Sequence, residues 1–111
     1  ISSDHRPEDV EHKKLEFGLA EMGIALIESF FSHYQSYLSE DISLSRFVTC
    51  ITEGPCTVLN LRLANIEIGK PAILTCFSTK ETAVASPQFT KAYNTPCIHP
   101  DMHGKVIGTW R

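Results

Sequence analysis

Hydrophobic and polar positions in the first third of the chain change period from helical to alternating. Residues 1–6 are predicted to end a strand, and Pro7 is favoured in the first turn of a following helix. Apolar residues then recur at i, i+4 and i+7, namely Leu15, Leu19 and Met22. We expect this helix to end at Gly23. Residues 24–31 are apolar on both alternating faces and predict a strand inside a sheet.

The remaining pattern predicts one more long helix and several strands. Apolar residues spaced i, i+3, i+4 and i+7 predict a second helix, and they are Leu44, Phe47, Val48 and Ile51. Gly54 and Pro55 are expected to stop it. Residues 56–63 alternate between apolar and polar side chains and predict a strand. Further strands are predicted at 72–77 and 105–110, with a short helix at 88–93.

The predicted order is strand, helix, strand, helix, strand, strand. This order predicts an α+β fold of the ferredoxin-like type, a βαββαβ antiparallel sheet with both helices on one face. The 111 residues suffice for a single domain over residues 1–111. Because the chain begins at Ile1 and not at Met, we expect it to be a fragment of a longer protein.

Composition and charge narrow the class of partner. Hydrophobic residues make up 42% and charged residues 21%, as in ordinary globular proteins. The net charge of −3 and the absence of a Lys/Arg-rich run disfavour a nucleic-acid partner. The longest aliphatic run, residues 24–27, is too short to span a membrane. None of the four cysteines lies in a C-x-x-C pair, so we expect reduced thiols and a cytoplasmic protein, with two disulfides as the alternative.

Three segments in this order resemble the pattern of nucleoside diphosphate kinases. They are Ile1-Ser2-Ser3-Asp4, Gly23-Ile24-Ala25-Leu26 and Thr52-Glu53-Gly54-Pro55-Cys56-Thr57-Val58-Leu59. The resemblance covers roughly residues 1–65 and implies a ferredoxin-like fold. It also implies a histidine that accepts the γ-phosphoryl group of a nucleoside triphosphate, with magnesium on the phosphates.

The chain departs from the family pattern at its catalytic positions. Ser2 and Ser3 stand where the family has lysine and proline, and the family's Asn-x-x-His-Gly-Ser-Asp stretch has no full counterpart. His103, which Gly104 follows, is the better candidate for the phosphoryl acceptor, and His99 is the second. The candidates for nucleotide binding are Tyr34, Arg62 and Asn94.

The resemblance with these departures implies a degenerate, non-catalytic member of the family. We expect it to bind a protein partner, either cytoskeletal or regulatory, or a nucleotide weakly, and oligomers are compatible with the fold. No cofactor is expected, since magnesium and a nucleoside triphosphate are required only if the domain is catalytic. One alternative is a divergent kinase that uses His103 or His99. The other is a small metal-binding domain built on Cys97, His99 and His103, for which an exposed tail without metal is the competing interpretation.

The remaining histidines have a simpler interpretation. His5, His12 and His33 lie on polar stretches of the chain, so we expect their rings to be solvated.

Overall fold

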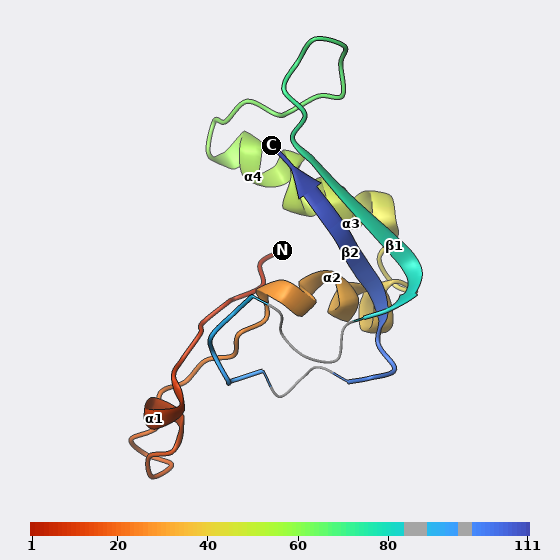
Figure 1. The fold of residues 1–111 in the computed structure, drawn as a ribbon. Helices are drawn as coiled ribbons and strands as arrows, with labels where there is room; N and C mark the ends of the chain where they lie inside the picture. The colour runs from red at the N-terminus through yellow and green to blue at the C-terminus, as the bar shows by residue number, and fades with distance from the viewer. Residues whose placement is uncertain (84–88, 96–98) are drawn as a thin grey trace.

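The computed structural model describes residues 1–83, 89–95 and 99–111 (Figure 1). Its elements are α1 (Val10–Lys13), η1 (Ile27–Ser29), α2 (Phe30–His33), η2 (Tyr34–Leu38), α3 (Leu44–Ile51), α4 (Glu53–Val58), β1 (Leu74–Thr82) and β2 (His103–Trp110). The helix predicted from the spacing of Leu44, Phe47, Val48 and Ile51 is confirmed as α3. Ser43 caps α3, because its hydroxyl accepts a hydrogen bond from the Arg46 N–H.

The two longest strands form an antiparallel pair, β1 with β2. The register pairs Leu74 with Trp110 and Cys76 with Gly108, and it shifts after Cys76. The predicted strands are therefore confirmed over 74–77 and 105–110; β1 begins two residues later than predicted, and both strands are longer. The ferredoxin-like arrangement stays a prediction, because one antiparallel pair and a few helices neither show nor refute it. Of the short helix predicted at 88–93, residue 88 lies outside the described residues and 89–93 are not helical.

The predicted strand over residues 24–31 is wrong, because the chain is helical from Ile27 to Leu38 through η1, α2 and η2. The reason is that a short apolar run fits both periods. Its apolar residues also follow the helical spacing i, i+3, i+4 and i+7, as Ile27, Phe30, Phe31 and Tyr34. The helical spacing gathers Phe31 and Tyr34 in the core, and extended structure persists only at Ile24, which forms an isolated parallel bridge with His5.

The predicted strand over residues 56–63 is also wrong. Glu53 to Val58 form α4, so Gly54 and Pro55 open a helix where the sequence predicted a stop. Proline is tolerated in the first turn of a helix because the N–H that it lacks has no partner there. The helix ends at Val58, and Asn60, two residues later, has a left-handed φ of 51°. The alternating leucines that follow are exposed loop residues.

The helix predicted to run to Met22 ends after one turn, at Lys13. A short helix is stabilised mainly by packing of its apolar face. Here Leu15, Leu19 and Met22, which would form that face, are 49%, 67% and 78% exposed, so the described residues bury little of it. In Figure 1, α1 lies at the tip of an extended arm, away from β1 and β2.

Asp9 caps α1 and titrates abnormally. Its carboxylate Oδ1 accepts a hydrogen bond from the His12 N–H at 2.8 Å, and this bond lowers the pKa of Asp9 below its ordinary value. A lowered pKa means that the charged cap stabilises α1 above the unfolded pKa and is lost as pH falls through the folded pKa. We expect an NMR titration to give Asp9 a pKa below the ordinary value of an aspartate. A pKa of Asp9 at or above that ordinary value would contradict the cap.

A small aromatic core joins the helices to the hairpin. Tyr34 stacks on Phe47, with ring centroids 3.8 Å apart and an interplanar angle of 12°. Phe31 contacts Phe77 of β1 at 4.5 Å between ring centroids. The Ser32 hydroxyl donates a hydrogen bond to the Gly104 carbonyl oxygen, which ties α2 to β2. These contacts hold the helical segment against the hairpin (Figure 1).

The structure also bears on the expected reduced thiols and on the expected lack of a membrane-spanning segment. Cys50, Cys56 and Cys76 are free thiols, whereas Cys97 lies outside the described residues. In the described part of the chain, no helix has the length and apolar character that crossing a membrane requires.

Candidate functional site

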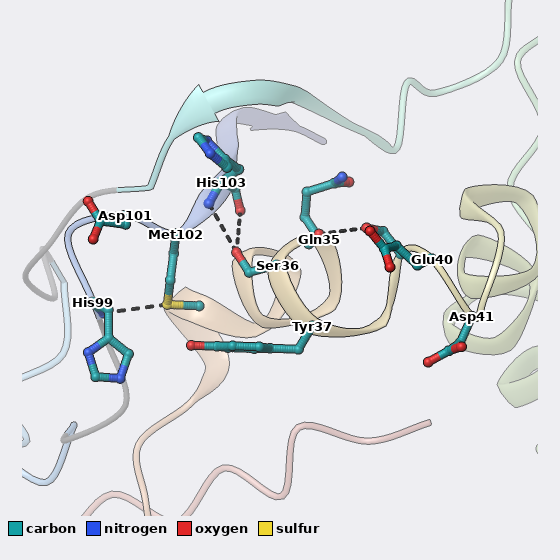
Figure 2. Close-up of a pocket in the computed structure, with 10 residues that line it drawn as sticks. Gln35, Ser36, Tyr37, Glu40, Asp41, His99, Asp101, Met102 and His103 are labelled. Carbon is teal, nitrogen blue, oxygen red and sulfur yellow. Dashed lines mark hydrogen bonds between the residues drawn. The ribbon is translucent and has the colours of Figure 1, made fainter.

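A cavity of about 560 Å³ lies between η2 and the start of β2 (Figure 2). It brings His99 and His103 together with Asp101, Met102 and residues 35–41. Ser36 fixes β2 at this place, because its hydroxyl accepts a hydrogen bond from the His103 N–H at 3.0 Å. The structure therefore places both candidate phosphoryl acceptors, His99 and His103, at one cavity.

The two imidazoles do not converge on a common point. Figure 2 shows the ring of His103 and the ring of His99 pointing away from each other. Within residues 1–83, 89–95 and 99–111, no three His, Cys, Asp or Glu side chains gather to hold a metal ion. Cys97, the third member of the expected metal-binding group, lies outside these residues.

Two of the expected nucleotide-binding residues, Tyr34 and Arg62, lie in different environments, the first in the core and the second on an exposed loop. The Tyr34 ring is 2% exposed in the core, and its hydroxyl donates a hydrogen bond to the Ile42 carbonyl oxygen at 2.8 Å. Arg62 is exposed in the loop after α4, where it lines a separate cavity of about 310 Å³. The structure does not bring either side chain to the cavity of His103.

Asn94, the third such residue, is the centre of a buried hydrogen-bond network. It is 7% exposed, and its side-chain NH₂ donates to the Arg6 carbonyl oxygen at 2.9 Å and to the Gly23 carbonyl oxygen at 3.1 Å. Its side-chain oxygen accepts from the Glu8 N–H at 3.1 Å, and its main-chain oxygen accepts from the Ala25 N–H at 3.0 Å. One amide therefore joins three segments that are far apart in the sequence.

The segment that Asn94 holds begins with Asp4 and His5, which we call the Asp4–His5 turn. Asp4 has a φ of 45°, in the left-handed region, where Asp and Asn are the best tolerated residues after Gly. Its carboxylate is exposed and has no hydrogen-bond or ion-pair partner among the described residues. A left-handed residue other than glycine is uncommon and marks positions worth considering for function.

His5 is fixed by the backbone and is not solvated as expected. Its ring nitrogen Nδ1 accepts hydrogen bonds from the N–H groups of Leu26 and Ile27, each at 3.2 Å. An acceptor nitrogen carries no proton, so the neutral ring holds its proton on Nε2. The Nδ1 atom of His33 is also bonded, to the Ser29 carbonyl oxygen at 2.8 Å. The expectation of solvated rings is therefore wrong for both histidines, because local backbone groups reach them.

Two further residues complete the network around the Asp4–His5 turn. Gly23 has a φ of 150°, and a Cβ there would lie 2.7 Å from the Arg6 Cβ and 2.8 Å from the Arg6 oxygen, so only glycine allows this approach. The Glu28 carboxylate accepts hydrogen bonds from the N–H groups of Phe89 and Thr90, the shortest at 2.6 Å. These bonds bring the segment that carries Asn94 back to the start of the chain.

The sequence did not predict that the Asp4–His5 turn and Glu28 form parts of one site. The signal that was present is an Asp-His pair at the end of a predicted strand, together with a glycine just before the next extended segment. That Glu28 and Asn94 belong to the same network depends on contacts across about 60 or more residues, which spacing does not reveal.

Comparisons with known proteins show that the chain is similar to dihydroorotases from several organisms. The chain is 31% identical over 112 residues to the dihydroorotase of Syntrophotalea carbinolica, covering 98% of the chain and 26% of that protein. It is 28% identical over 107 residues to the dihydroorotase of Sulfurisphaera tokodaii, covering 96% of the chain and 27% of that protein. With the Bacillus subtilis dihydroorotase it shares 28% identity over 100 residues, covering 86% and 23%. No family model matches the chain, and no solved structure matches it significantly.

These findings overturn the resemblance to nucleoside diphosphate kinases. The short matching segments lie within one continuous similarity to dihydroorotases, which includes the residues after position 65 that the resemblance did not cover. The expected kinase-like interaction module and the alternative of a divergent kinase are therefore wrong. The chain spans about a quarter of the length of the curated relatives it matches, and what it resembles is a segment of a dihydroorotase.

Proposed function

We propose that the chain is a segment of a dihydroorotase-type enzyme, which opens or closes the ring of dihydroorotate. The observation that carries the proposal is the similarity to dihydroorotases, which runs through 98% of this chain. Since the chain spans 26% of that relative, the rest of the catalytic machinery would come from further polypeptide.

The surface of the chain supports packing against such further polypeptide. Its accessible surface is 8703 Å², whereas a folded monomer of this mass exposes about 6,100 Å². Large apolar side chains account for part of the excess, and the most exposed are Phe17, Ile66 and Ile68. The parallel bridge between His5 and Ile24 has no neighbouring strand among the described residues, and parallel pairs normally lie inside larger, covered sheets. The remainder of a dihydroorotase-length polypeptide would cover these groups.

The chemistry gives the Asp4–His5 turn a role in this enzyme. Ring opening of dihydroorotate adds water to a ring carbonyl and breaks the adjacent C–N bond, so a base must remove a proton from water and a donor must help the nitrogen to leave. The Asp4 carboxylate is exposed and unpartnered among the described residues, which suits a base. The fixed tautomer of His5, the next residue in the chain, presents an Nε2–H donor. The described residues alone hold no group of ligands for a metal ion, so metal activation of the water would need ligands from elsewhere.

The direct test is turnover by the full polypeptide that carries this chain. We expect it to consume dihydroorotate and to form the ring-opened N-carbamoyl acid, and to form dihydroorotate from that acid. We also expect no acid-labile, base-stable phosphohistidine after incubation with labelled ATP and magnesium. A folded full polypeptide that leaves dihydroorotate intact would contradict the proposal.

A further inference from the structure

We propose that Asn94 is a positioning residue that holds the Asp4–His5 turn in its reactive geometry. The inference rests on the proposed function, and it adds a residue that touches neither the substrate nor the reacting groups. Asn94 is buried at 7% exposure, and every hydrogen-bonding group of its side chain has a backbone partner.

Asn94 forms hydrogen bonds to both segments that determine the geometry of the Asp4–His5 turn, the one that follows His5 and the one that precedes Leu26. On one side, its amide binds the Arg6 oxygen and the Glu8 N–H, directly after His5 in the chain. On the other side the amide donates to the Gly23 oxygen, and the Asn94 main-chain oxygen accepts from the Ala25 N–H, directly before the N–H groups of Leu26 and Ile27 that bind the His5 ring. The side chain of Asn94 therefore links the segment after His5 to the segment before Leu26, and it helps to fix the position of the His5 ring.

No other side chain among the described residues can substitute for this contact. Apart from the two hydrogen bonds to the His5 ring, the direct link between the two segments is a single backbone bridge, in which the Arg6 N–H donates to the Ile24 carbonyl oxygen at 2.9 Å. The Lys13 ammonium reaches only the second segment, at the Gly23 oxygen, and only at 3.4 Å. Without the Asn94 side chain, the part-buried carbonyl oxygens of Arg6 and Gly23 and the Glu8 N–H lose this partner together, and the two segments are held less firmly. The left-handed Asp4 backbone, which is uncommon for a residue other than glycine, would then relax.

The test compares Asn94→Ala and Asn94→Asp with Ser32→Ala in the full polypeptide. Asn94→Asp keeps the acceptor for the Glu8 N–H but turns an oxygen toward the Arg6 and Gly23 oxygens, so it is a second variant of nearly unchanged shape. Ser32→Ala removes a buried hydrogen bond to Gly104, away from the turn, and controls for loss of stability alone.

We expect both Asn94 variants to lower kcat for dihydroorotate at least tenfold and to change KM less than threefold. Amide hydrogen exchange at Leu26 and Ile27 should accelerate at least tenfold, because the His5 ring no longer holds them. Ser32→Ala should keep kcat within twofold and leave this exchange unchanged. An Asn94 variant with wild-type kcat, or with unchanged exchange at Leu26 and Ile27, would overturn the role of Asn94. A wild-type polypeptide without activity would instead overturn the proposed function, and the exchange would still decide whether Asn94 holds the turn.

Discussion

Replacing Asp4 by asparagine is expected to lower kcat for dihydroorotate about 100- to 10,000-fold, which is the contribution of a general base. Asparagine also tolerates the left-handed backbone that Asp4 adopts at φ 45°, so the substitution removes the charge without adding strain. The measurement is steady-state turnover of dihydroorotate by the full polypeptide, with circular dichroism to show that the fold is intact.

The matched control for this substitution is Asp101→Asn. Asp101 is another exposed aspartate, and it lines the cavity of His103 and not the Asp4–His5 turn. We expect its kcat to stay within about twofold of wild type. An Asp4→Asn enzyme as active as the Asp101→Asn enzyme would show that Asp4 is not the base, even if the polypeptide hydrolyses dihydroorotate.

Replacing Phe47 by alanine is expected to lower the free energy of unfolding by about 3–5 kcal/mol. Phe47 is 2% exposed, and it contacts the rings of Phe30, Phe31 and Tyr34. Phe47 belongs with Phe31 and Tyr34 to the buried core cluster, so its loss removes a large part of the core. Chemical denaturation of the full polypeptide, followed by far-UV circular dichroism, measures the change.

The control for this substitution is Val48→Ala on the same helix. Val48 is 37% exposed, so the loss of its two methyl groups should cost about 1 kcal/mol or less. Equal losses for the two variants would mean that α3 is not anchored through Phe47. Activity should fall with Phe47→Ala only as far as the folded fraction falls, because Phe47 lies outside the Asp4–His5 network.

Local sequence patterns predicted an element correctly where the apolar spacing fits only one kind of secondary structure. The spacing of Leu44, Phe47, Val48 and Ile51 fits a helix alone, and the structure has one there. The run from Ile24 to Phe31 fits both a strand and a helix. The helix forms because it brings Phe31 into the aromatic core. Gly54 and Pro55 are compatible with the first turn of a helix as well as with the residues after its end. In the structure they lie in the first turn of α4, which ends shortly before the left-handed Asn60.

The candidate site was only partly predictable. Asn94 was singled out, but for nucleotide binding, and its contacts are with Arg6, Glu8 and Gly23. Those contacts span 71 to 88 positions, so no local period could reveal them. The short kinase-like segments misled because each matches only a few residues, whereas the similarity to dihydroorotases runs through nearly the whole chain.

The most direct measurement is ring opening of dihydroorotate in H₂¹⁸O by the full polypeptide, with the product analysed by mass spectrometry. We expect a product heavier than dihydroorotate by one molecule of ¹⁸O-labelled water, with the label in the new carboxylate, because hydrolysis places the oxygen of water on the ring carbonyl. Unchanged dihydroorotate from a folded polypeptide, together with phosphohistidine formed from labelled ATP, would contradict the assignment of this chain to a dihydroorotase-type enzyme.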